Sequence, residues 1–170
     1  LLFVYRDKMK LHTFGITFDI SREETKKVLY YIPMFLSIIP LLAKGIDWIG
    51  SRYIGSLFFF AIMIAIAEES YFRGVIFQKL ISIYDDNKTI MLSALLFGLA
   101  HSVCIISGCS IIMVALQVMN AFIFGIIAAQ LLVITRSILP GMIYHFWFDF
   151  VNHITKLDGL ALFIASAVQV

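Results

Sequence analysis

The feature that most constrains this sequence is a series of long apolar runs that fill most of the chain. The runs cover residues 28–43, 53–84, 89–107, 110–134, 138–154 and 160–170. A helix needs about 20 apolar residues to cross a bilayer. The chain is 61% hydrophobic and 14% charged, with a mean hydropathy of +0.96, an excess that a soluble core of this size could not enclose. We therefore predict an all-α polytopic membrane bundle of about five to six transmembrane helices.

The domain organisation follows from the same pattern. The sequence shows no internal repeat or boundary, so residues 1–170 are expected to form a single membrane domain. Residues 1–27 comprise an apolar tail and a basic segment, and 28–170 form the bundle. Leu1 is not a methionine, which predicts that the sequence begins partway through a longer protein. The composition excludes a soluble enzyme and a disordered chain, and a net charge of +2 gives no reason to expect nucleic acid as a partner.

Positive charges in the loops predict an orientation. If 53–84 crosses once, nine Lys and Arg residues fall on the side of residues 6–27 and three on the other. The positive-inside rule then places segment 6–27 in the cytoplasm of a multi-pass protein of the cell membrane, here a bacterial plasma membrane. As a single helix 53–84 would be roughly 45 Å long, so the pattern allows either one helix or two.

Ionisable residues interrupt three of the apolar runs. A charge at mid-bilayer costs about 2.5–3.5 kcal/mol on insertion scales, so such residues need a partner or a function. They fall in runs 53–84, 89–107 and 138–154, which predicts a site between three helices. These residues are Glu68, Glu69, Arg73, His101, His145 and Asp149, with Asn152 and His153 near the end of the last run.

Helical spacing assigns roles in the first of these runs. Glu69 and Arg73 are separated by four residues in the favourable order for an ion pair, so they are expected to neutralise each other and support the site. Glu68 points about 100° away around the helix. It has no local cation and is the candidate general base.

Spacing also relates the polar residues of the last run. His145, Asp149 and Asn152 lie on one helix face. Asp149, one turn from His145, is predicted to set the tautomer of that imidazole. His101 taken alone could equally be an interhelical hydrogen-bonding residue. Cys104 and Cys109 are predicted to be two small buried apolar residues.

Three motifs in this order resemble a known family. Residues 68–73 read EExxxR, 97–101 read FxxxH, and 145–149 read HxxxD. Together they are similar to the CAAX protease and bacteriocin-processing (CPBP) family, which includes Rce1-type CAAX proteases and bacteriocin-immunity proteins. The resemblance covers about residues 54–155.

The resemblance implies an intramembrane endopeptidase that cuts a peptide or membrane-protein substrate near the membrane face. Glu68 with His101 would activate the attacking water, and His145 with residue 149 would stabilise the oxyanion. Glu69 and Arg73 would hold the site together. Glu68, His101, His145 and Asp149 could alternatively ligate Zn²⁺, and the residues fit either chemistry. The partners expected are the lipid bilayer and the substrate.

Position 149 departs from the pattern, because many family members have Asn there. An ionised carboxylate only accepts hydrogen bonds and would repel an oxyanion. Asp149 is therefore protonated, orients His145, or binds metal, and Asn152 is the candidate oxyanion donor in its place.

Two other functions compete with the peptidase. The same fold could serve as a non-catalytic membrane immunity or binding protein, in which Glu68→Gln would be tolerated. Buried Glu, His and Asp residues could also relay protons in a carrier, although the chain lacks the inverted repeats typical of carriers.

Overall fold

The computed structural model describes residues 53–154 together with Lys26, Leu29 and Ile32, and the 53–154 part is all-α. Helix α5 continues through a π-helical turn, η4, into α6, and α7 continues into a 3₁₀ turn, η5. The elements are α5 (Ile54–Tyr71), η4 (Phe72–Ile76), α6 (Phe77–Ile81), α7 (Asp86–Ala100), η5 (His101–Ser107), α8 (Ile111–Thr135) and α9 (Leu139–Ile154). Run 53–84 is therefore one long helix with a π turn inside it.

Three of these helical segments are long and apolar enough to cross a membrane: Ile54–Ile81, Asp86–Ile106 and Ile111–Thr135. The protein is thus a multi-pass membrane protein. Helix α9 has 16 residues, fewer than the roughly 17–25 of a spanning helix. Apart from Lys26, Leu29 and Ile32, the basic segment 6–27 and the predicted run 28–43 lie outside the described residues, as does the run 160–170. A total of five to six spans stays a prediction.

The helix boundaries follow from local caps. The Asp85 side chain accepts a hydrogen bond from the Lys88 amide at 3.0 Å, so α7 begins at Asp86, earlier than the predicted residue 89. Ser110 caps α8 in the same way through Met113. Gly108 adopts a left-handed conformation, with φ of 85°, that ends η5.

The prediction for the two cysteines was wrong. Cys104 and Cys109 form a disulfide across the turn between η5 and α8, and both residues are half-buried. The left-handed Gly108 reverses the chain, and the Cys109 amide donates to the Cys104 carbonyl at 3.3 Å. The two Cα atoms come within 5.7 Å, a separation that a disulfide spans readily.

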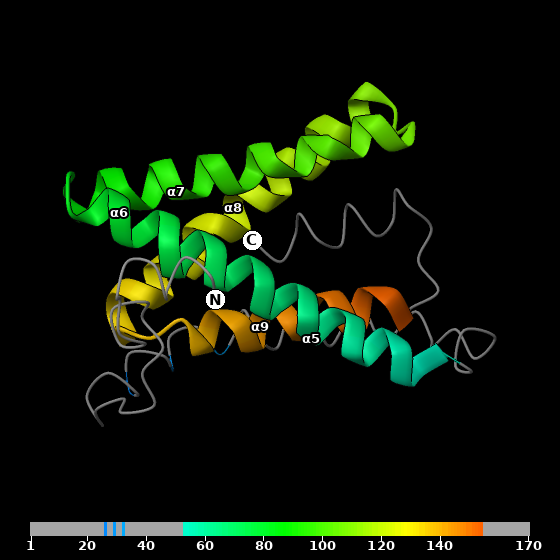
Figure 1. The fold of residues 1–170 in the computed structure, drawn as a ribbon, viewed down its shortest axis with the longest axis horizontal. Helices are drawn as coiled ribbons and strands as arrows, with labels where there is room; N and C mark the ends of the chain where they lie inside the picture. Colours follow the sequence, from blue (N-terminus) through cyan, green and yellow to red (C-terminus); the bar gives the residue numbers. More distant parts are fainter. Residues whose placement is uncertain (1–25, 27–28, 30–31, 33–52, 155–170) are drawn as a thin grey trace, which may run out of the picture.

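The helices pack as two pairs (Figure 1). Helix α5 lies beside α9, and α7 lies beside α8, while α8 also contacts α9. Aromatic side chains fill the space between the pairs. The Phe72 ring of η4 packs against Phe97 of α7 with centroids 4.9 Å apart, and Phe124 of α8 stacks on Tyr144 of α9 at 5.5 Å.

Glycines allow α7 and α8 to approach closely. A Cβ atom added at Gly125 would lie 2.9 Å from the Ala94 Cα, and one added at Gly98 would lie 2.8 Å from the Val118 carbonyl oxygen. Both separations are too short for any side chain, and both involve backbone atoms that cannot rotate away. Packing of this kind, through small residues, is how helices associate in lipid.

Gly125→Ala is expected to lower the free energy of unfolding in detergent by about 1–3 kcal/mol, because the added methyl group forces the helices apart. Gly55→Ala is the matched control, since a Cβ at Gly55 meets nothing within 4 Å. Thermal unfolding of both variants, followed by circular dichroism, checks the expectation. Equal melting temperatures for the two would contradict the close α7–α8 contact.

Candidate active site

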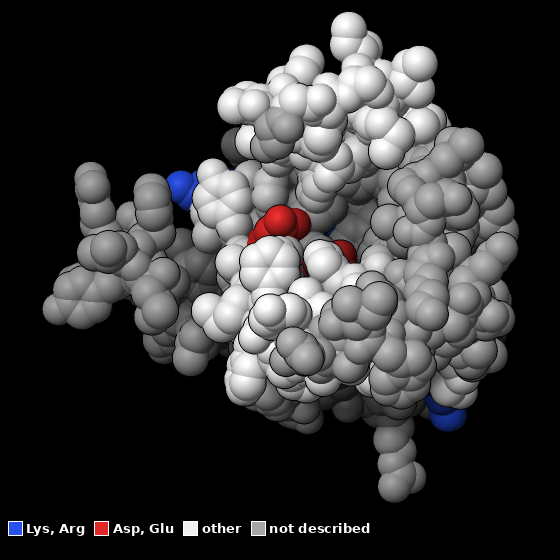
Figure 2. Space-filling model, turned by 90° about the vertical axis from the view of Figure 1, so that its right-hand side faces the viewer, with Lys and Arg blue, Asp and Glu red and all other residues white. Residues whose placement is uncertain are grey.

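The polar residues of the predicted site meet in one cavity of about 310 Å³. The sequence predicted a site between three helices, but four helices line this cavity because α8 contributes a wall. Figure 2 looks into the hollow and shows acidic side chains among residues that are neither acidic nor Lys or Arg. The polar residues that line it are Glu68, His101, Gln117, Asn120, His145 and Asp149.

A buried ion pair supports the site from behind. Arg73 Nη1 donates to Glu69 Oε1 at 3.0 Å, and the two residues are 1% and 0% exposed. The pair predicted from the four-residue spacing is therefore present. Arg73 Nη2 also donates to the Gly125 carbonyl of α8 at 3.2 Å, and the guanidinium lies 4.4 Å from the centre of the Phe97 ring. The pair thereby joins α5 and η4 to both α7 and α8.

Glu69 also orients His145. The Nδ1 atom of His145 lies 3.1 Å from Glu69 Oε1. Arg73 neutralises this carboxylate, which can only accept, so the His145 Nδ1–H donates to it. Asp149, which was predicted to orient this ring, faces the other ring nitrogen, Nε2, with its Oδ2 atom at 3.5 Å, and its role in orienting the ring stays a prediction. The contact with Glu69 was not predicted because it is tertiary: α5 brings Glu69 against α9.

His101 is oriented by its own helix. Its Nδ1 lies 2.9 Å from the Phe97 carbonyl oxygen. A carbonyl oxygen can only accept, so Nδ1 carries the hydrogen and Nε2 is left with its lone pair when the ring is neutral. The Nε2 atom faces Glu68 Oε2 at 4.0 Å.

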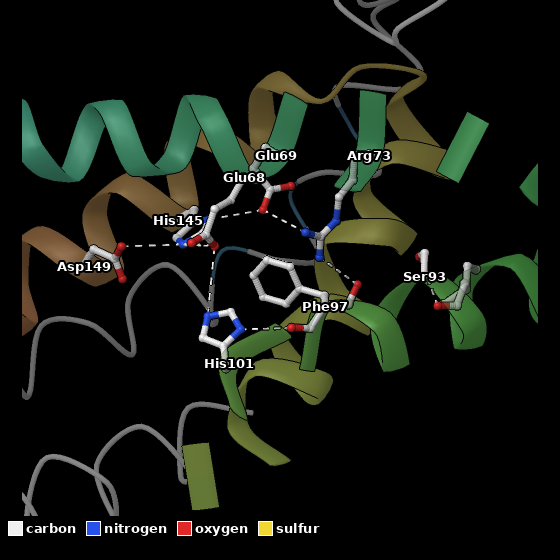
Figure 3. Close-up of polar contacts among 10 residues, drawn as sticks. Glu68, Glu69, Arg73, Ser93, Phe97, His101, His145 and Asp149 are labelled. Carbon is white, nitrogen blue, oxygen red and sulfur yellow. Dashed lines mark hydrogen bonds and ion pairs between the residues drawn. The ribbon is translucent and has the colours of Figure 1, made fainter. Parts of the chain in front are cut away.

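Glu68 lies between the two histidines, as Figure 3 shows. Its Oε2 atom is 3.8 Å from His145 Nε2 as well as 4.0 Å from His101 Nε2, and it receives no hydrogen bond from the described residues. These separations are too long for direct hydrogen bonds and suit a bridging water. The Glu68 side chain is 34% exposed as a whole, but its Oε2 atom is buried, so a water between Oε2 and the histidines would lie inside the cavity.

Two amide side chains in the cavity escaped the sequence analysis. Gln117 and Asn120 of α8 line the cavity, whereas Asn152, the candidate oxyanion donor, is not among the lining residues. The sequence prediction rested on ionisable residues within apolar runs, so the neutral amides of α8 were not predicted. A usable signal existed, because the two amides are three residues apart and share one face of the helix, in a half of α8 that is otherwise apolar.

A metal site is the alternative use of these donors. Among residues 53–154, no group of three or more His, Cys, Asp or Glu side chains has an arrangement that could hold a metal ion. The four residues predicted as alternative zinc ligands thus form no such group. We derive no step of the chemistry through a metal.

Residues 50–151 match the model of the type II CAAX prenyl endopeptidase Rce1-like family. No curated protein and no solved structure matches the chain. The family match spans more than half of the sequence and includes all three motifs and the cavity they line. The chain therefore belongs to the Rce1-like family of type II CAAX prenyl endopeptidases.

Proposed function

We propose that this protein is an intramembrane endopeptidase that hydrolyses a peptide bond with a water activated by Glu68. The observation that carries the proposal is the position of Glu68 Oε2, 3.8 Å and 4.0 Å from the Nε2 atoms of His145 and His101. Family membership supports the same chemistry. A water bridging Glu68 and His101 would be held inside the cavity, next to a bound peptide.

In the proposed reaction the water oxygen attacks the scissile carbonyl carbon and its proton passes to Glu68. The tetrahedral intermediate then collapses, the C–N bond breaks, and the proton passes to the leaving nitrogen through Glu68 or His101. His145 would stabilise the oxyanion from Nε2 when that atom carries a proton. Its Nδ1–H is held by Glu69 at 3.1 Å, so the ring is already oriented before substrate binds.

The oxyanion needs a neutral donor as well. Glu68 and Asp149 face the cavity as acceptors when ionised, and they would repel a developing negative charge. Asn120 and Gln117 each place in the cavity lining a side-chain amide, which donates hydrogen bonds without adding charge. Asn120 is half-buried whereas Gln117 is exposed, so we assign the oxyanion contact to Asn120.

Glu68→Gln is expected to lower kcat by at least about 100-fold, because it removes the base but keeps the shape of the side chain. Cleavage of a labelled peptide panel in liposomes measures this. Asp86→Asn, which makes the same acid-to-amide change at an exposed position, is the control and should keep full activity.

Each arm of this assay is also run with a chelator. Activity that persists with chelator supports glutamate chemistry, and its loss would restore the zinc alternative. A bacteriocin-protection phenotype that survives Glu68→Gln, with no cleavage by either protein, would overturn the peptidase in favour of a non-catalytic immunity or binding protein.

Asp149→Asn is expected to leave kcat equal or higher. Asp149 Oδ2 and Glu68 Oε2 both face His145 Nε2, at 3.5 Å and 3.8 Å, and the substitution removes one of two like charges while adding a donor. Peptide cleavage by the variant checks this. A complete loss of activity would instead assign Asp149 a charged role.

Asn120→Ala is expected to lower kcat by about 100-fold with little change in KM, because an oxyanion donor acts mainly in the transition state. Asn87→Ala, at an exposed position on α7 far from the cavity, is the matched control. Restoration of most of the activity by Asn120→Gln, which keeps the amide, would separate donation from packing. A rise in KM alone would remove Asn120 from this role.

A further inference from the structure

Among the described residues, none is buried at the end of the α7–α8 pair that carries His101. The last buried residue of α7 is Gly98 and the first of α8 is Ala121. Between them every residue whose burial is described is half-buried or exposed. In Figure 1 the pair runs towards this turn at the upper right, away from α5 and α9. Fully buried contacts therefore do not fix this end of the pair, and such segments open locally at low cost.

The candidate active site depends on this end of the pair. Three of the polar residues that line the cavity lie on it: His101 at the start of η5, and Gln117 and Asn120 in the first half of α8. Any opening of the η5–α8 turn would therefore displace part of the cavity wall, although the buried part of the bundle could remain intact.

The two histidines of the site are held in different ways. His145 is 5% exposed and is bound by the buried Glu69 of another helix, at 3.1 Å. His101 is half-buried, and the Phe97 carbonyl that orients it, at 2.9 Å, belongs to its own helix. That hydrogen bond fixes the ring on the helix, but it does not fix the helix end relative to Glu68.

The Cys104–Cys109 disulfide supplies the missing constraint. Cys104 lies in η5 three residues after His101, and side chains three residues apart in a 3₁₀ helix lie on the same face. Cys109 directly precedes Ser110, the N-cap of α8. The bond thus ties the turn that carries His101 to the start of the helix that carries Asn120. A cross-link of this kind removes open conformations of the turn.

The disulfide also lies where a reductant can reach it. Both cysteines are half-buried, and Ile106 and Gly108 between them are exposed. The sequence contains no other cysteine, so a thiol reagent has a single target in the chain. A thiolate of a dithiol attacks one sulfur, and its second thiol resolves the mixed disulfide. Two electrons and two protons pass to the two cysteines, and the reagent itself becomes a disulfide.

We propose that the Cys104–Cys109 disulfide is a positioning element that keeps His101 within reach of Glu68, and that its reduction by a dithiol reversibly lowers the rate of hydrolysis. The effect on rate rests on the proposed hydrolysis. The effect on η5 does not, because it follows from the burial pattern and the cross-link. Without the bond η5 opens locally, and His101 Nε2 leaves its place 4.0 Å from Glu68 Oε2.

Peptide cleavage by the full chain, before and after treatment with dithiothreitol, tests the effect on rate. Reduction is expected to lower kcat by at least about tenfold with a smaller change in KM, because His101 acts on the water and not on substrate binding. Reoxidation should restore kcat. The Cys104→Ser, Cys109→Ser double variant should start at the reduced rate and not respond to the reagent. An unchanged kcat after complete reduction, checked by thiol titration, would overturn the proposal.

A His101→Ala variant separates positioning from general loosening of the bundle. The substitution lowers kcat by itself, and the residual activity should show no further loss on reduction, because both changes remove the same contact. A further loss as large as that of the unmodified chain would show that the disulfide acts elsewhere, and would overturn its role in positioning His101.

Hydrogen exchange followed by mass spectrometry tests η5 without any need for catalysis. After reduction the amides of residues 102–109 are expected to exchange faster, while those around the buried Glu69–Arg73 pair keep their protection. If no peptide is cleaved in either redox state, the proposed hydrolysis fails, and hydrogen exchange alone decides whether the disulfide holds η5. Faster exchange in 102–109 would support this, and unchanged exchange would overturn it.

Discussion

The ion pair between Arg73 and Glu69 is the interaction on which the rest of the site depends. A guanidinium and a carboxylate that are both about 1% exposed would be very costly in an apolar bundle without each other. The pair also contacts two further helices, since Arg73 donates to the Gly125 carbonyl of α8 and Glu69 accepts from His145 of α9. Among the described residues, Arg73 Nε and Glu69 Oε2 have no hydrogen-bond partner. Removal of either charge would leave the other buried and unpaired, a loss of about 3–5 kcal/mol.

The same pair determines what the adjacent residue can do. Glu69 forms the ion pair with Arg73, so Glu68 does not need to. Glu68 instead faces the cavity, where its Oε2 atom lies 4.0 Å from His101 Nε2 and 3.8 Å from His145 Nε2. Each imidazole is oriented by a different acceptor, the Phe97 carbonyl for His101 and the Glu69 carboxylate for His145. Both rings thus present Nε2 toward Glu68. The hydrogen bonds that orient the rings lie on the side of the site away from Glu68, and the cavity lies on the side of Glu68.

Much of this could be predicted from local sequence. The apolar runs predicted the helices, and the four-residue spacing of Glu69 and Arg73 predicted their ion pair. Both predictions depend only on which residues lie together on a single helix. The contributions of α8 could not be found in this way. Asn120 is an uncharged residue on a run without motif residues, and its place in the cavity depends on how closely Gly125 lets α8 approach Ala94.

The sequence by itself determined the all-α membrane class, the family resemblance and the identity of the charged residues that need partners, because burying charge in lipid is costly wherever it occurs. Only the tertiary structure decided which partner each residue has. Glu69 rather than Asp149 holds His145 Nδ1, and Cys104 pairs with Cys109. The first pairing depends on the packing of α5 against α9, and the second depends on the chain reversal at Gly108. Neither the way two helices pack nor the path of a turn can be read from the residue spacing within one segment.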